Sequence, residues 1–433
     1  MKESNISLSV IPAIITQHAE EAAFLWLLRD AAVREPHYSL NDLANLDNRV
    51  EAHIDGLRIA GDEGWEICKE SLAWEEAGEV FTAAVLAFEK GNDDWIQTVL
   101  EAGSESLELS RGIISALGWL PYQQAEAHIQ KLLSSESPDL HRIGIAASAV
   151  HRKDPGGYLA DAVADKNPLL KARALKAAGE LGRKDLLPFI STMVNDNDDN
   201  CRFWASWSAA LLGDMNAVAA LKAYITSMLP PPPGTFPQGA REKPEEAVKL
   251  AFRRVDISSA HNWQKELAQN PGTIRPALIG AGVIGDPVLI PWIIDQMAAP
   301  EPARLAGEAF TMITGVDIAY EDLEGERPEG FEAGPTEEPE DEDVETDPDE
   351  DLPWPEPQLV KDWWDKNKGR FENGVRYFLG KPITPEHLRQ VLAAGLQRGR
   401  AAAALELAIM QPGQPLFEVR APGFRQKRIL GLK

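Results

Sequence analysis

The sequence predicts an all-α protein: an α-solenoid of stacked helical hairpins followed by a small C-terminal helical module. Three stretches, which begin near residues 141, 171 and 201, repeat the same order of a small-residue helix, a polar turn and a second helix. Equivalent positions stand 31 residues apart, as in Ala147, Ala178 and Ala209. A period near thirty residues with two helices per unit is typical of solenoids, in which each hairpin buries its apolar face against the next.

Each part of the repeat has a physical role. The first helix carries Ala and Gly where a neighbour must approach closely, and it ends near Gly182 or Gly213, because glycine tolerates a left-handed helix end. The second helix has apolar residues at three- and four-residue spacing, as in 187–194. Asp165, Asp196 and the run that follows Asp196 supply capping side chains for the next unit.

We predict four segments along the chain. They are an N-terminal helical region that caps the array at 1–74, the repeat array at 75–318 with a proline-rich loop at 228–246, an acidic disordered tether at 319–356, and a small C-terminal helical module at 357–433 with helices at 384–394 and 397–410. The tether is expected because 321–351 has 17 acidic residues against one arginine, so that the segment repels itself.

The repeats resemble HEAT repeats, specifically the short kind first noted in phycobilisome-lyase proteins. Arg173 and Arg202 match the arginine near the start of such a unit, and Leu181-Gly182 and Leu212-Gly213-Asp214 match its central turn. The resemblance covers about residues 75–315 and implies a fold rather than an activity.

The layout of the whole chain is similar to a family of bacterial HEAT-like proteins that are often encoded near type VI secretion components. The features that carry this similarity are the repeats, the segment 303–318, the tether, the Trp363-Trp364 pair and the basic C-terminal end. The resemblance implies a context of effector delivery or of protection from an effector. It supplies no catalytic residues.

Charge and composition restrict the classes of partner that we expect the chain to bind. The net charge is −25, and the residues outside 321–351 carry about −9, which opposes binding to phosphate backbones. No stretch approaches the roughly twenty apolar residues of a membrane span, and no signal-type cleavage pattern occurs, so we expect a cytoplasmic protein without nucleic-acid or membrane partners. Cys68 and Cys201 lie in apolar helical patterns and are expected to be reduced core thiols.

No motif points to catalysis, a cofactor or a metal. The glycines of 280–285 fit a dinucleotide pattern, but a helix precedes them and a turn follows them, so tight helix packing is the better interpretation. The aspartates 347, 349 and 351 have the spacing of a calcium loop, without its glycine and its closing glutamate. We therefore predict no enzyme, no cofactor and no metal site.

The candidate partner-binding residues are Arg202, Trp204 and Trp207, since the two tryptophans lie three apart on one helix and Trp and Arg are enriched in protein interfaces. The alternative is that the tryptophans pack between repeats. We expect the partner to lie along a concave face lined by the second helices.

The sequence thus predicts a non-enzymatic protein-binding scaffold, an adaptor, chaperone or immunity protein for a secreted effector or spike component. A short-HEAT enzyme, such as a bilin lyase or an alkyl-base DNA glycosylase, is the alternative. A glycosylase should show a basic concave face with aromatic residues and a carboxylate.

Overall fold

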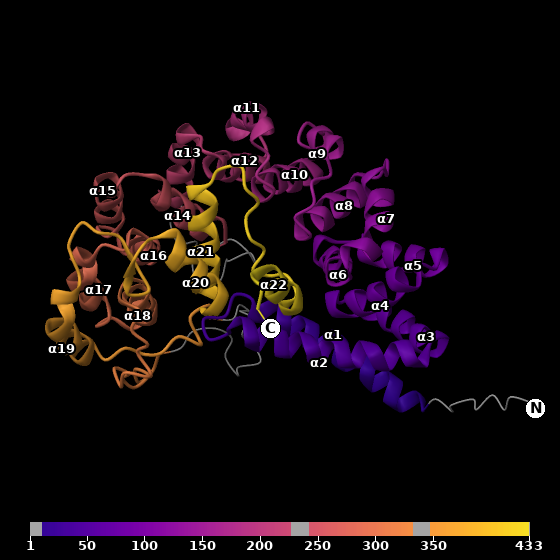
Figure 1. The fold of residues 1–433 in the computed structure, drawn as a ribbon, viewed down its shortest axis with the longest axis horizontal. Coiled ribbons are helices and arrows are strands. Elements are labelled where there is room, and N and C mark those ends of the chain that lie inside the picture. Colours follow the sequence, from indigo (N-terminus) through magenta and orange to yellow (C-terminus); the bar gives the residue numbers. More distant parts are fainter. Residues whose placement is uncertain (1–10, 227–241, 332–346, 433) are drawn as a thin grey trace, which may run out of the picture. The chain divides into compact units, whose positions relative to one another are not determined.

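The computed structural model describes residues 11–226, 242–331 and 347–432. The chain forms two compact units: unit 1 comprises residues 1–181 and 418–433, and unit 2 comprises residues 182–417. Among the described residues the regular structure is almost entirely helical, and the one sheet is a two-stranded hairpin (Figure 1). The predicted all-α solenoid is confirmed.

Unit 1 begins with an N-terminal group of helices and continues with the first repeats. Its helices are α1 (Pro12–Ala32), α2 (Leu40–Ala60), α3 (Asp62–Ser71), α4 (Ala77–Lys90), α5 (Asp93–Gly103), α6 (Leu107–Trp119), α7 (Tyr122–Leu133), α8 (Pro138–Val150), α9 (Gly157–Ala162), α10 (Pro168–Glu180) and α22 (Gly423–Leu430). The first helices of successive repeats, α4, α6, α8 and α10, pack side by side, α1 packs against α4, and α22 packs against α2.

Small residues allow the helices of the repeats to approach closely. A Cβ atom on Gly112 in α6 would lie 2.5 Å from the carbonyl oxygen of Ala77 in α4. A Cβ atom on Gly144 in α8 would lie 2.8 Å from the backbone nitrogen of Leu133 at the end of α7. Larger residues would push these helices apart, which explains the small-residue pattern of the repeat.

Unit 2 continues the repeats and adds the C-terminal elements. Its elements are α11 (Leu187–Ile190), α12 (Asp199–Leu212), α13 (Met215–Thr226), α14 (Glu242–Arg254), α15 (Ile257–Leu267), α16 (Ile274–Ile284), α17 (Ile290–Gln296), α18 (Pro300–Thr314), α19 (Pro357–Asn367), α20 (Pro385–Ala394), α21 (Gln397–Met410), β1 (Tyr377–Phe378) and β2 (Lys381–Pro382). The strands are antiparallel, with Phe378 opposite Lys381. The first helices α12, α14, α16 and α18 again pack in succession.

The repeat units match the predicted hairpins with local differences. The second helix expected over 187–194 is broken into the short α11 between 3₁₀ turns at Lys184–Leu186 and Ser191–Asn195. The N-caps of α10 and α12 are Asn167 and Asp198, whereas Asp165 and Asp196 accept hydrogen bonds from the backbone two residues later. The acidic run therefore forms an Asx turn that leads into the cap.

The expected C-terminal module does not form a body of its own. In unit 2, α21 packs against α12 and α14, β1 packs against α18, and α19 packs against α17. Residues 418–433 belong instead to unit 1. The helices expected at 384–394 and 397–410 are present as α20 and α21.

The expected tether at 319–356 is too wide. Leu323 and Leu352 are buried, and Glu324 pairs with Pro355 in an isolated β-bridge, so both ends of this segment pack on unit 2. Its middle, 332–346, lies outside the described residues, as does most of the proline-rich loop, whose last residues begin α14 at Glu242.

Two further observations concern composition. In the part of the chain that the structure describes, no helix combines the length and the apolar character that a membrane crossing requires.

Cys68 and Cys201 are buried thiols, as predicted, and burial raises the pKa of Cys68 to about 12.

Candidate functional site

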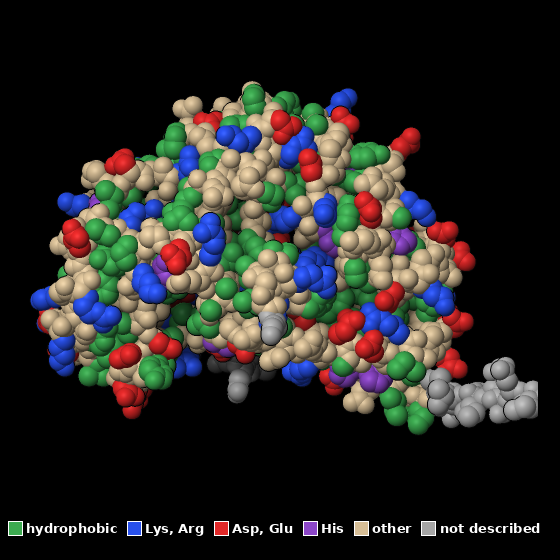
Figure 2. Space-filling model, viewed as in Figure 1, with side chains coloured by type: hydrophobic (Ala, Val, Ile, Leu, Met, Phe, Trp, Pro, Cys, Tyr) green, Lys and Arg blue, Asp and Glu red, His purple; other side chains and the backbone are tan. Residues whose placement is uncertain are grey.

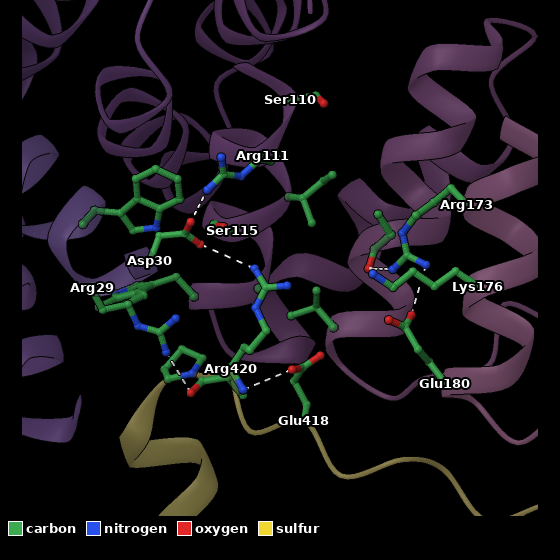
Figure 3. Close-up of a pocket in the computed structure, with 18 of the residues that line it drawn as sticks. Arg29, Asp30, Ser110, Arg111, Ser115, Arg173, Lys176, Glu180, Glu418 and Arg420 are labelled. Carbon is green, nitrogen blue, oxygen red and sulfur yellow. Dashed lines mark hydrogen bonds and ion pairs between the residues drawn. The ribbon is translucent and has the colours of Figure 1, made fainter. Parts of the chain in front are cut away.

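Three arginines stand 31 residues apart near the starts of successive first helices: Arg111 in α6, Arg142 in α8 and Arg173 in α10. Because these helices pack side by side in register, the repeat period brings the arginines to one face. All three line a cavity of about 370 Å³ that lies wholly within unit 1 (Figure 3). We call these three residues the arginine ladder.

The opposite walls of the cavity come from α1 and from residues 418–422. Arg29 of α1 donates hydrogen bonds of 2.9 Å to the carboxylate of Asp47 in α2 and to the carbonyl oxygen of Ala421. The backbone nitrogen of Gly423 also donates to Asp47. These bonds fix the C-terminal segment against α1 and α2.

The charged residues that line the cavity are mostly cationic, although the whole chain is acidic. Its basic residues are Arg29, Arg34, Arg111, Arg142, Arg173, Lys176 and Arg420, and its acidic residues are Asp30, Glu180 and Glu418. The excess of positive charge inside a partly enclosed space favours an anionic ligand, since charges interact more strongly away from bulk water.

The carboxylates of the lining are held by arginines at opposite ends of the cavity. Asp30 bonds with Arg111 and lies 3.5 Å from Arg420, and Glu180 lies 3.0 Å from Arg173 (Figure 3). These contacts show that the ladder is able to hold carboxylates.

The pKa values of the same two carboxylates, Asp30 and Glu180, reflect a positive potential in the cavity. Burial alone raises the pKa of Glu180, but the charges of Arg173, Lys176 and Arg152 outweigh burial and lower this pKa to about 2. Burial likewise opposes ionisation of Asp30, and nearby arginines, led by Arg420 and Arg111, hold its pKa below the usual range.

Arg142 is the least compensated cation of the ladder. It is only 6% exposed, and its Nη2 donates a 3.0 Å hydrogen bond to Ser110 Oγ. The carboxylate of Asp139 lies 4.0 Å from Nε, and within the described part of the chain Nε has no hydrogen-bond partner. Burial lowers the pKa of Arg142; Asp139 opposes this lowering, and Arg173 adds to it. Such a buried group is costly unless a ligand pairs with it.

The predicted partner-binding residues lie elsewhere, on α12 in unit 2. Trp207 is only 4% exposed, so its assignment to an exposed anchor is wrong, and packing explains it. Trp204 is half-buried, and its ring lies edge-on to Phe203 and Trp207 at centroid distances of 4.9 and 5.8 Å. Arg202 is half-buried and donates to the Asp199 carboxylate at 2.7 Å.

The arginine ladder could have been found from the sequence. The 31-residue step that relates the alanines also relates the three ladder arginines, and from Arg173 it leads to Trp204. Arg202 is therefore two residues out of register, and its match to Arg173 is wrong. The cavity is also lined by first helices, not by the second helices that the sequence led us to expect.

The glycine pattern at 280–285 is helix packing, as predicted. It forms the end of α16 and the turn after it, where Gly285 has φ +72°. A Cβ atom on Gly280 would lie 3.0 Å from the ring of Phe252.

Residues 158–228 match the family model of HEAT repeats. Together with the packed hairpins, this match supports HEAT-like repeats in this part of the chain. A comparison with curated proteins finds no match. Among solved structures, the crystal structure of an engineered protein is similar, with a TM-score of 0.31 and 13% identity over 70% of this chain and 90% of that chain. A TM-score this low supports no further conclusion.

Proposed function

We propose that this protein is a non-enzymatic scaffold that binds another protein across several of its repeats. The observation that carries the proposal is the arginine-lined cavity, to which three successive first helices each contribute the same residue type at the same register. HEAT-like repeats form extended surfaces on which each unit adds a few contacts, and arginine is enriched at protein-binding hot spots.

The narrower role within this proposal is that of a cytoplasmic adaptor, chaperone or immunity protein in a type VI secretion context, with a secreted effector or a spike component as partner. Its support is the similarity of the chain layout to HEAT-like proteins encoded near such components. An immunity protein should block its effector's activity in a stoichiometric complex, whereas an adaptor or chaperone should leave that activity intact.

A base-removing enzyme is the second candidate, because the cavity has arginines, tryptophans and carboxylates together. Its tryptophans, however, are only 2% and 4% exposed at Trp26 and Trp119, so their faces cannot stack on a flipped base. Asp30 and Glu180 are both engaged by arginines, which disfavours a general base. On the face seen in Figure 2, acidic and basic side chains are interspersed, unlike the basic band of a DNA-binding surface.

The test uses the full chain. Affinity capture from native lysate should yield a protein partner, and the purified pair should form a stoichiometric complex. Cross-links from the partner should then concentrate on α1, α6, α8, α10 and residues 418–422. Release of alkylated bases from DNA, lost in Asp30→Asn, would overturn the proposal. Cross-links confined to other elements would also contradict it.

A further inference from the structure

In unit 2, arginines near the starts of first helices bind carboxylates. Arg304 is the fifth residue of α18, as Arg142 is the fifth residue of α8. Its guanidinium bonds to the carboxylate of Asp347 and donates a 2.9 Å hydrogen bond to the carbonyl oxygen of Asp349. Arg275, in the neighbouring first helix α16, grips the carboxylate of Asp349 with two hydrogen bonds of 2.5 and 3.2 Å. The turn that contains Asp347 and Asp349, which we call the acidic turn, thus bridges the first helices α16 and α18.

This acidic turn is enclosed. Asp349 and Arg304 are each 5% exposed, and the Arg304 guanidinium lies over the rings of Trp354 and Phe331, at 4.6 and 5.4 Å from their centroids. Two of the three aspartates of the calcium-like spacing, Asp347 and Asp349, are therefore bonded to arginines, and the expectation that these two lie in a solvated tether is wrong. A bidentate contact such as that of Arg275 with Asp349 is among the strongest carboxylate contacts.

The arginine ladder of unit 1 has corresponding residues but faces a cavity. Arg111 and Arg173 hold Asp30 and Glu180 at its ends, and between them the one carboxylate near Arg142 among the described ion pairs is that of Asp139, at 4.0 Å. A volume of about 370 Å³ lies near the lower end of the range for ligand pockets, about 300–1,000 Å³. The cavity therefore takes a few side chains rather than a folded element.

We propose that this cavity binds an acidic peptide segment of the protein partner, with a carboxylate on Arg142 and a second carboxylate, two residues away, on a neighbouring ladder arginine. The inference rests on the proposed function and supplies the chemistry of the partner. The acidic turn on Arg275 and Arg304 is the structural precedent within the same chain. The bidentate contact of Arg275 with Asp349 and the buried charge of Arg142 favour carboxylates over neutral amides.

The test measures binding of a fluorescent peptide, Asp-Pro-Asp-Glu-Asp-Leu-Pro, to the full chain by anisotropy; this peptide has the sequence of residues 347–353. The matched control peptide replaces each acid by its amide. The variants are Arg142→Met and, as a control in the same unit, Arg49→Gln, since Arg49 is exposed on α2. We expect the acidic peptide to bind the wild-type chain. Its affinity for Arg142→Met should be at least tenfold lower, and its affinity for Arg49→Gln should equal that for the wild type. Added salt should weaken binding.

A folding readout separates a ligand site from a structural one. Arg142→Met removes a buried, poorly paired charge, and Ser110 keeps its hydrogen bond to the carbonyl oxygen of Leu107, so the melting temperature should stay level or rise. If Arg142→Met melts at a lower temperature than the wild type, Arg142→Lys serves as the second variant, because it keeps the charge without the planar guanidinium. Weaker peptide binding by Arg142→Lys at an unchanged melting temperature supports the proposal.

Several outcomes would overturn the proposal. They are equal binding of the amide peptide, undiminished binding to both Arg142 variants, and competition by inorganic phosphate as strong as that by the peptide. Loss of binding in Arg275→Gln but not in Arg142→Met would show that the peptide exchanges with the acidic turn of unit 2, which also overturns it. A stoichiometric partner complex would remain possible after each of these results, so this failure differs from failure of the proposed function.

Discussion

Arg173 and Glu180 lie seven residues apart on α10, and Nη1 of Arg173 donates a 3.0 Å hydrogen bond to the carboxylate of Glu180 at one end of the cavity. The pair joins two turns of the helix and places a buried carboxylate next to a cationic wall. Its stability depends on ionisation of Glu180, and this dependence can be measured.

The pKa of Glu180 falls from an ordinary value of 4.5 to about 2 in the folded chain. A lowered folded-state pKa contributes stability that is fully present above the unfolded pKa and is lost as pH falls through the folded pKa. The free energy of unfolding of the wild type relative to Glu180→Gln should therefore be constant above about pH 5.5 and decline by about 2 kcal/mol by pH 3. Urea titrations of both proteins across this range test it, and a pH-independent difference would contradict it.

Gly112→Ala should destabilise unit 1 by about 1–3 kcal/mol, because the new methyl group meets backbone atoms that cannot rotate away. The clash is with the carbonyl oxygen of Ala77 at 2.5 Å. Gly157→Ala is the matched control, since its Cβ would meet nothing within 4 Å. Denaturant unfolding should separate the two variants, and equal midpoints would show that α4 and α6 do not pack as closely as described.

Trp207→Ala should cost about 3–5 kcal/mol, since it removes a ring that is 4% exposed. Trp204→Ala, whose ring is half-buried, should cost less. Differential scanning fluorimetry compares the two. A smaller loss for Trp207 than for Trp204 would reverse our assignment of Trp207 to the core. Unchanged partner binding by Trp204→Ala would exclude Trp204 as an anchor and leave Arg202 as the remaining candidate on α12.

Asp349→Asn should loosen the acidic turn, because it weakens both hydrogen bonds from Arg275. Hydrogen exchange of the amides in 347–356 should then speed up by tenfold or more, since charge-assisted bonds are worth about 1.5–3 kcal/mol. Glu350→Gln is the control, because Glu350 lies in the same turn without a contact to Arg275 among the described ion pairs. If both variants exchange at the wild-type rate, the turn is held by other contacts.

The sequence predicted the parts of the fold that depend on local pattern. The 31-residue register located the hairpins around Ala147, Ala178 and Ala209, because each hairpin repeats the same helix-packing problem. The same register contained the ladder of Arg111, Arg142 and Arg173, but a charge on a helix is usually solvated, and nothing in one sequence shows which helix face is enclosed.

Long-range contacts were the part that the sequence could not supply. The acidic run around Asp349 has the composition of an unfolded tether, and only its contacts with Arg275 and Arg304 change that interpretation. Trp207 and Trp204 share one helix, and nothing in one sequence shows which face of that helix is covered. No periodic pattern in the sequence indicates that residues 418–433 belong to unit 1.

That assignment also has a consequence for biosynthesis. The contacts of Asp47 with Gly423, and of Arg29 with Ala421, span 376 and 392 residues, so they cannot form until residues 421–423 have left the ribosome. Contacts this distant in sequence are among the last to form during folding. A nascent chain that stops before residue 418 has the arginine ladder but lacks the wall provided by Glu418 and Arg420. The cell therefore obtains a complete cavity only once residues 418–422 have been made, and products truncated before them cannot compete for its ligand with the same site.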